Sequence, residues 1–191
     1  MHIREMQRAF TLVELLICLV IMALITGYMV PSMGPMVERS RAASAINWIV
    51  TAVIFTRDAA ITREQTVTLC PSASGHSCGG KWYDGAIAFT DANMDTHING
   101  DDHLLRRFVF PVKGATLSWH AFRNRQYLQM TAEGFTNYQN GNFIYCPPDN
   151  DPRFARQLVI NMQGRSRLSI DKNDDGIVDD RRGHDLTCAR Q

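Results

Sequence analysis

A stretch of residues without any charge runs from residue 15 to residue 37, directly after Glu14. About 20 consecutive apolar residues are enough for a helix to cross a bilayer, so the stretch predicts a membrane-embedded helix. Glu14 would then lie at membrane depth, where a carboxylate costs roughly 2.5 to 3.5 kcal/mol. The sequence therefore predicts a protein whose assembly supplies Glu14 with a partner. A plain single-pass anchor that contains a stray acid is the alternative.

The residues before this segment predict its orientation. They include Arg4 and Arg8 against the single acid Glu5. Basic residues beside a first apolar span favour keeping that side in the cytoplasm, so the rest of the chain is expected in the periplasm, anchored to the inner membrane. A secretory signal peptide has its small-residue cleavage site after a shorter apolar core. Here the small residue, Ala9, precedes the core, and the segment is expected to remain as an anchor.

Residues 9–14, with the sequence AFTLVE, resemble the class III signal of type IV pilins and type II secretion pseudopilins. The resemblance implies that a prepilin peptidase cuts between Ala9 and Phe10 and that the new amine of Phe10 is methylated. It also implies that the Glu14 carboxylate pairs with the methylated ammonium of a neighbouring subunit. Ala9 stands where the family usually has Gly. Three segments follow from this resemblance: a leader at 1–9, a transmembrane and assembly helix at 10–35, and a periplasmic domain at 36–191.

The size and charge of the remaining chain limit what it can be. The 191 residues, less the leader and the span, leave enough for one domain of ordinary size. Twenty basic and 19 acidic side chains give a net charge of +1. The overall charge therefore indicates neither a nucleic-acid binder nor a partner of acidic surfaces, and any electrostatic binding has to be local.

Four of the five cysteines lie in the part predicted to be exported. An even number of cysteines in an oxidising periplasm predicts two disulfides. Three pairings are open, and we favour Cys70 with Cys78 and Cys146 with Cys188. A structural zinc site is the alternative, but the spacing lacks the close CxxC pairs that such sites use. Cys18 lies in the apolar span and is expected to be a small buried apolar side chain.

The chain after the span predicts a continuing helix and then strands. Pro31 removes one backbone hydrogen bond and is expected to kink or loosen the helix. Beyond it, apolar residues recur at spacings of three and four, which predicts one helix from about Phe10 to Glu64 with an amphipathic second half. The stripe consists of Ala42, Ala45, Ile46, Ile49, Val53, Ala60 and Ile61.

From residue 66 the pattern changes to short runs separated by Gly, Pro, Asn and Asp. Strands are expected at 66–70, 86–90, 104–110, 116–122, 127–131 and 142–146. A last run at 157–170 turns at Gly164 and is either a hairpin or one bent strand. The fold class is therefore α+β, with an antiparallel sheet packed on the second half of one long helix, which is the architecture of pilins.

Several segments of this domain resemble the GspH/FimT/FimU family of minor type IV pilins and type II secretion pseudopilins. The matching segments are 68–72, Cys78 with Trp82 and Gly85, 89–95, 104–106, 143–146, and 155–161 before Gly164 and Arg165. The resemblance implies a low-abundance subunit at or near the tip that helps to initiate a filament. Its partners are then other pilins or pseudopilins. The resemblance does not separate a minor pilin from pseudopilin H.

Two acidic stretches resemble calcium-binding loops. In residues 171–180 the candidate ligands are Asp171, Asn173, Asp175 and Asp179, with Gly176 at the sharp turn, but Arg182 stands where the last ligand is expected. In the other stretch they are Asp91, Asn93, Asp95, Asn99 and Asp102, with Thr96 in place of the turn Gly. Calcium is thus a candidate cofactor. The alternatives are a solvated turn that tethers the tail ending at Cys188 for residues 171–180, and a polar hairpin loop for the other stretch.

A short basic motif, GRSR, occupies residues 164–167. Arg165 and Arg167 occupy alternate positions of an expected strand and face the same side. Guanidinium groups suit phosphate oxygens, and in some FimT-like minor pilins a GRxR motif at this point contacts incoming DNA. The resemblance implies DNA capture during natural transformation. Alternatively, both arginines pair with Asp171, Asp174 or Asp175.

Catalytic patterns are not found in the sequence. It contains no GxSxG motif, and Glu133, the single Glu of the sheet region, precedes a turn Gly. The histidines after the span are scattered among expected loops and short strands: His76, His97, His103, His120 and His184. An enzyme is not expected.

Overall fold

The structure is a computed structural model that describes residues 10–29 and 33–188. Ala9 and Pro31, which carried predictions about processing and helix bending, lie outside the described residues. The chain divides between Val37 and Glu38 into two units, of which the second contains all the strands.

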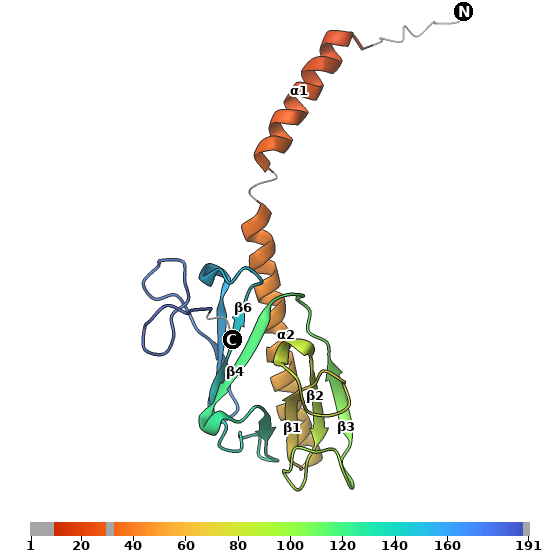
Figure 1. Cartoon of the computed structure of the whole chain (residues 1–191), viewed down its shortest axis with the longest axis vertical. Helices are drawn as coiled ribbons and strands as arrows, with labels where there is room; N and C mark the ends of the chain where they lie inside the picture. Colours follow the sequence, from red (N-terminus) through yellow and green to blue (C-terminus); the bar gives the residue numbers. More distant parts are fainter. Residues whose placement is uncertain (1–9, 30–32, 189–191) are drawn as a thin grey trace, which may run out of the picture. The chain divides into compact units, whose positions relative to one another are not determined.

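Two helices are described within the range predicted as one helix, and the residues between them, 30–32, lie outside the described residues (Figure 1). α1 spans Leu12–Met29 and α2 spans Met33–Arg63. α2 ends in a Schellman motif, because Gln65 N–H donates to Ala60 O at 3.2 Å and Glu64 N–H donates to Ile61 O at 3.3 Å. Glu64 adopts the left-handed conformation, with φ 53°, that such a cap requires. The chain then turns directly into the first strand.

The apolar stripe of α2 packs into the core of the second unit. Its predicted members Ala42, Ala45, Ile46, Ile49, Val53 and Ala60 are all buried. Ile61 was predicted to be buried and is 44% exposed, because it lies at the rim of the packed face beside the turn at Gly134. Many of the buried residues are alanines, whose small side chains let the helix approach the sheets closely.

The strands form two four-stranded antiparallel sheets rather than one (Figure 1). The first has the order β3-β2-β1-β5 and the second the order β4-β6-β7-β8. The strands are β1 (Val67–Pro71), β2 (Ala86–Thr90), β3 (Leu104–Phe108), β4 (Thr116–Ala121), β5 (Leu128–Met130), β6 (Gly141–Cys146), β7 (Arg156–Ile160) and β8 (Ser166–Leu168). The predicted α+β class with antiparallel strands is thereby confirmed.

The run at 157–170 is a hairpin, since β7 and β8 pair in antiparallel register. Its turn needs Gly164, which has φ +70° and whose missing Cβ would lie 2.7 Å from Gly134 O. The two sheets share one core with α2, in which Trp119 packs on Phe143 with ring centroids 4.4 Å apart. Phe143 also meets Trp82 edge-on, with ring centroids 4.8 Å apart.

Candidate functional site

α1 is apolar and exposed on every side. All described side chains at residues 10–27 are exposed, among them Leu12 at 76% and Met22 at 67%. Among the described residues, α2 alone is long and apolar enough to cross a membrane by length and composition, but 39% of its most apolar stretch is buried in the structure, as in a core helix. The apolar part of α1, Leu12–Gly27, is shorter. A helix that is apolar all round requires lipid or other helices around it. α1 is therefore the element that fits a membrane or a helical assembly.

Glu14 lies in the first turn of α1, where its backbone N–H donates to Thr11 Oγ1 at 3.3 Å. Thr11 and Glu14 have the T-x-x-E spacing of a capping box, a signal that the sequence analysis did not use. A carboxylate near a helix N terminus gains about 0.3 to 1 kcal/mol from the helix dipole. That gain is smaller than the roughly 2.5 to 3.5 kcal/mol cost of placing it in the membrane. Inside a membrane, this local stabilisation alone would therefore not offset the cost of the Glu14 charge.

The structure joins Cys70 to Cys78 and Cys146 to Cys188, the pairing that the sequence favoured, with Cα–Cα distances of 5.5 and 5.7 Å. Cys18 was expected to be buried and is exposed, like the rest of α1.

The second disulfide fixes the segment that follows β8. Val178 and Leu186 of this segment are buried in a small cluster with Ala155. Leu186 N–H donates to Val178 O at 2.9 Å, and an isolated bridge pairs Asp179 with Asp185. Residues 170–188 are thus held by one covalent bond and a few apolar contacts.

The acidic stretch in this segment is a network of Asx turns. Asp171 accepts hydrogen bonds from the backbone N–H groups of Asp174 at 2.8 Å and Gly176 at 2.7 Å. Asn173 and Asp175 also accept backbone hydrogen bonds, from Asp175 N–H and Ile177 N–H. The buried Asp179 accepts from Lys172 N–H at 2.7 Å. Within residues 10–29 and 33–188, no group of three or more His, Cys, Asp or Glu is arranged to hold a metal.

Asp185 is an acid of this segment that the loop pattern did not include. Loss of hydration first, and then the charges of Asp175 and Asp179, raise the pKa of its carboxyl. Asp185 cannot be identified from the loop pattern, because the bridge to Asp179 brings it in from beyond the loop. Calcium binding by Asp171, Asn173, Asp175 and Asp179 stays a prediction.

The other acidic stretch begins with a fully buried carboxylate, that of Asp91. Thr68 Oγ1 donates to it at 2.6 Å and Gln129 Nε2 donates at 3.1 Å. The backbone N–H groups of Asp95 and Thr96 also donate to Asp91, at 3.0 and 3.1 Å. Asp91 therefore ties β1 and β5 to the loop after β2, as the hairpin-loop alternative predicts.

Arg165 and Arg167 are both exposed, on the β7–β8 turn and on the edge strand β8. The alternative interpretation paired them with Asp171, Asp174 or Asp175. Among the ion pairs of the described residues, none involves either guanidinium within 4.0 Å. Both guanidinium groups are accordingly available to solvent or to a ligand.

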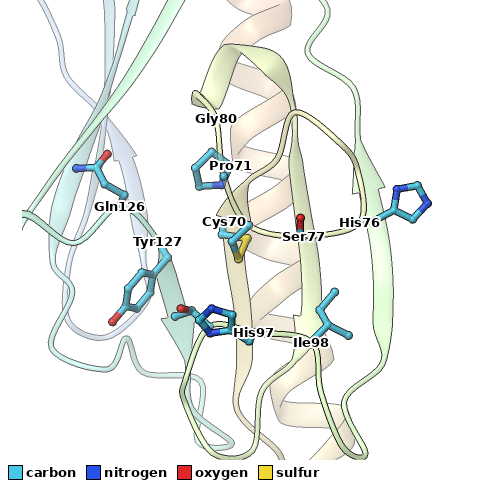
Figure 2. Close-up of a pocket in the computed structure, with 12 residues that line it drawn as sticks. Cys70, Pro71, His76, Ser77, Gly80, His97, Ile98, Gln126 and Tyr127 are labelled. Atoms are coloured by element: carbon cyan, nitrogen blue, oxygen red, sulfur yellow. A yellow bond between two sulfur atoms is a disulfide. The ribbon is translucent and has the colours of Figure 1, made fainter.

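A pocket of about 430 Å³ lies beside the Cys70–Cys78 disulfide (Figure 2). Gln126 and Tyr127 also line the pocket, and Figure 2 shows them on the segment across from Cys70. His76 and His97, which looked scattered in the sequence, both line it because their loops meet there. Both cysteines are in the disulfide, so neither is a free thiol.

Comparison with known proteins agrees with this fold. The structure is similar to the type IV minor pilin FimU of Pseudomonas aeruginosa, with a TM-score of 0.50 and 18% identity over 70% of this chain and 92% of that one. The minor pseudopilin EpsH from the type 2 secretion system of Vibrio cholerae is similar at a TM-score of 0.42 and 10% identity, over 66% of this chain and 92% of EpsH. None of the curated proteins matches the sequence.

Two family models match the sequence itself. Residues 4–30 match the prokaryotic N-terminal methylation motif. The matched residues include Glu14 and the whole of α1. Residues 45–164 match the family described as Type II transport protein GspH, from the packed part of α2 to the β7–β8 turn. With more than half of its length matched, the chain belongs to the GspH family of pilin-like proteins.

Proposed function

We propose that the chain is a minor pilin that joins or initiates a type IV pilus through its N-terminal helix. The observation that carries this proposal is α1, whose apolar side chains are exposed on all sides while its single acid, Glu14, lies in the first turn. In a filament, α1 packs among the corresponding helices of other pilins. Before assembly it holds the subunit in the inner membrane, with the second unit in the periplasm.

Processing places Glu14 close to a new N-terminal amine. A prepilin peptidase that cuts after Ala9 leaves Phe10 as the new N terminus, with Glu14 as the fifth residue. The methylated ammonium of a neighbouring subunit then supplies the positive charge that Glu14 lacks within its own helix. Each charge neutralises the other in an apolar environment, and the pairing fixes the register between subunits.

Type II secretion pseudopilin H is the alternative, supported by the GspH family match. The same fold serves both roles, so the fold does not separate them. Deleting the gene and assaying surface pili and secreted enzymes side by side tests the proposal. Loss of pili with normal secretion supports the minor pilin, whereas loss of secretion with normal pili supports the pseudopilin.

DNA capture is a second candidate function, favoured by the two solvent-facing guanidinium groups on the β7–β8 hairpin. Arg165 precedes β8 and Arg167 lies within it, two residues apart. A hairpin tip that presents two cations without carboxylate partners fits the phosphates of a DNA backbone. This role is compatible with assembly, since it uses the second unit rather than α1.

We expect the double substitution Arg165→Gln and Arg167→Gln to weaken DNA binding and to flatten its salt dependence. The slope of log K against log salt is negative, and each lost contact with a duplex phosphate reduces its magnitude by about 0.9. Electrophoretic shift assays across a range of salt concentrations measure both effects. The matched control is Arg181→Gln with Arg182→Gln, which removes the same charge from an exposed part of the C-terminal segment. Unchanged shifts for the Arg165 and Arg167 variant contradict DNA capture.

A further inference from the structure

Three turns meet at one end of the second sheet. The strand register places Ala121 of β4 opposite Gly141 of β6, Gly141 opposite Ile160 of β7, and Ile160 opposite Ser166 of β8. The turns that leave or enter these strand ends therefore lie in a row. With neighbouring strands about 4.8 Å apart, the row is about 14 Å long.

Exposed aromatic side chains lie along this row. Phe122 follows β4 and is 57% exposed, and Tyr138 is 69% exposed. The segment that carries Tyr138 runs from the β7–β8 turn to the end of β4, because Thr136 N–H donates to Met162 O at 2.9 Å and Phe122 N–H donates to Asn140 O at 3.1 Å. On the way it passes β5, where Asn137 N–H donates to Gln129 O at 3.1 Å. Along this segment Tyr138 therefore lies between the β7–β8 turn and Phe122. Neither ring contributes to the core.

The turns of this row carry more basic than acidic side chains, although the chain as a whole is nearly neutral. Residues 112–148 contain one acid, Glu133, and residues 152–170 contain none. The row and its flanks carry Arg123, Arg125, Arg165 and Arg167. None of these four arginines takes part in an ion pair in the described part of the chain. Arg123 lies over the ring of Phe122, with its Cζ 5.6 Å from the ring centroid.

The backbone of this end is fixed in uncommon conformations. Arg123, Asn124 and Tyr138 have positive φ values of 62°, 52° and 56°. Residues other than Gly adopt such values at a cost, and they cluster where a side chain must be presented in a fixed direction. The row is also tightly packed, since a Cβ on Gly141 would lie 2.3 Å from His120 O. Arg123 and Tyr138 therefore project from turns whose backbone takes these uncommon conformations.

We infer that this end of the second sheet binds single-stranded nucleic acid, with bases stacked on Phe122 and Tyr138 and phosphates held by Arg123 and Arg165. The inference rests on the proposed DNA capture and names the form of DNA that is captured. Exposed aromatic rings beside cations are the usual combination for single strands, whose bases present their faces for stacking. A duplex hides those faces, and the arginines alone would contact its phosphates.

Fluorescence anisotropy on the full chain in detergent micelles tests this inference. The probes are a labelled 20-nucleotide oligo-dT and a duplex of the same length. We expect tighter binding of oligo-dT than of the duplex. Phe122→Ala and Tyr138→Ala should each weaken oligo-dT binding by roughly 5- to 150-fold, as expected for a stacked base worth about 1 to 3 kcal/mol. Neither variant should change binding of the duplex, and Tyr83→Ala, at an exposed aromatic outside the row, is the matched control.

The salt dependence of binding tests separately whether the arginines hold the phosphates. Arg123→Gln should reduce the magnitude of the slope of log K against log salt for oligo-dT by about 0.7, the value for one phosphate contact of a single strand. Equal binding of single strand and duplex, with no effect of Phe122→Ala and Tyr138→Ala, contradicts the inference but leaves DNA capture by Arg165 and Arg167 standing. Displacement of oligo-dT by polyglutamate at equal charge concentration also contradicts it, because the surface would then respond to charge alone. Binding of neither oligonucleotide overturns both proposals.

Discussion

Glu14→Ala is expected to insert into the membrane and to be processed, yet to reach filaments at least tenfold less than the unmodified subunit. The substitution leaves the methylated ammonium of the neighbouring subunit without its partner in an apolar environment. Breaking a buried ion pair on one side costs about 3 to 5 kcal/mol, and each 1.4 kcal/mol corresponds to a factor of ten. Immunoblots of sheared filaments and of the inner membrane, expressed as a ratio, measure the effect.

Two further variants separate the charge from the local helix structure. Glu14→Gln keeps the shape of the side chain without its charge and should fail nearly as completely as alanine. Thr11→Ala removes only the hydroxyl that accepts the Glu14 N–H and should assemble almost normally. Incorporation of Glu14→Ala at the level of the unmodified chain contradicts the pairing mechanism. A strong defect in Thr11→Ala alone assigns Glu14 to helix capping instead.

Removing the Cys146–Cys188 disulfide is expected to have the largest effect on the stability of the second unit. A crosslink across 42 residues restricts the unfolded chain by about 4 kcal/mol in the loop-entropy account, against about 2.5 kcal/mol for the eight-residue separation of Cys70 and Cys78. Domains of this size are stable by only about 5 to 15 kcal/mol in total. Cys146→Ser with Cys188→Ser should therefore lower the urea midpoint clearly, measured by the fluorescence of the buried Trp82 and Trp119.

The same variant should also release the C-terminal segment, because without the disulfide a small apolar cluster of Val178 and Leu186 with Ala155 and Ile144 is left to hold it. Limited proteolysis should cut within residues 170–188 while the two sheets remain intact. Cys70→Ser with Cys78→Ser is the matched control, since it also removes one disulfide but leaves this segment tied. Equal urea midpoints for the two double variants, with no new cleavage, contradict this account of the second disulfide.

Local patterns in the sequence predicted most of the elements. The three and four spacing identified the buried face of α2, and turn residues separated the runs that became strands, as in β2, which occupies the predicted 86–90. The patterns could not predict two sheets, because periodicity along a strand carries no information about which strand lies beside it. The periodicity of α2 likewise does not show where the sheets end. The predicted stripe is therefore buried except at Ile61, which lies beside the turn at Gly134 instead of a sheet.

The candidate sites also divide into those that a local sequence pattern identifies and those that distant residues form together. Glu14 is a candidate that the sequence alone identifies, because its signal is local, a carboxylate beside an apolar run. Asp91 resembles a calcium ligand in the sequence, and only the structure shows its hydrogen-bond donors Thr68 and Gln129, which are distant in the sequence. The row of Phe122, Tyr138 and Arg165 could not be predicted, since only the pairing of β4, β6, β7 and β8 brings the three turns together.

Assembly through a processed N-terminal helix is the central claim, and the mass of the mature protein tests it most directly. Mass spectrometry of the chain purified from the membranes of cells that contain a prepilin peptidase should show a protein that begins at Phe10 and carries one methyl group on its N-terminal amine. An intact leader from Met1 to Ala9, in cells whose other pilins are processed, contradicts the claim.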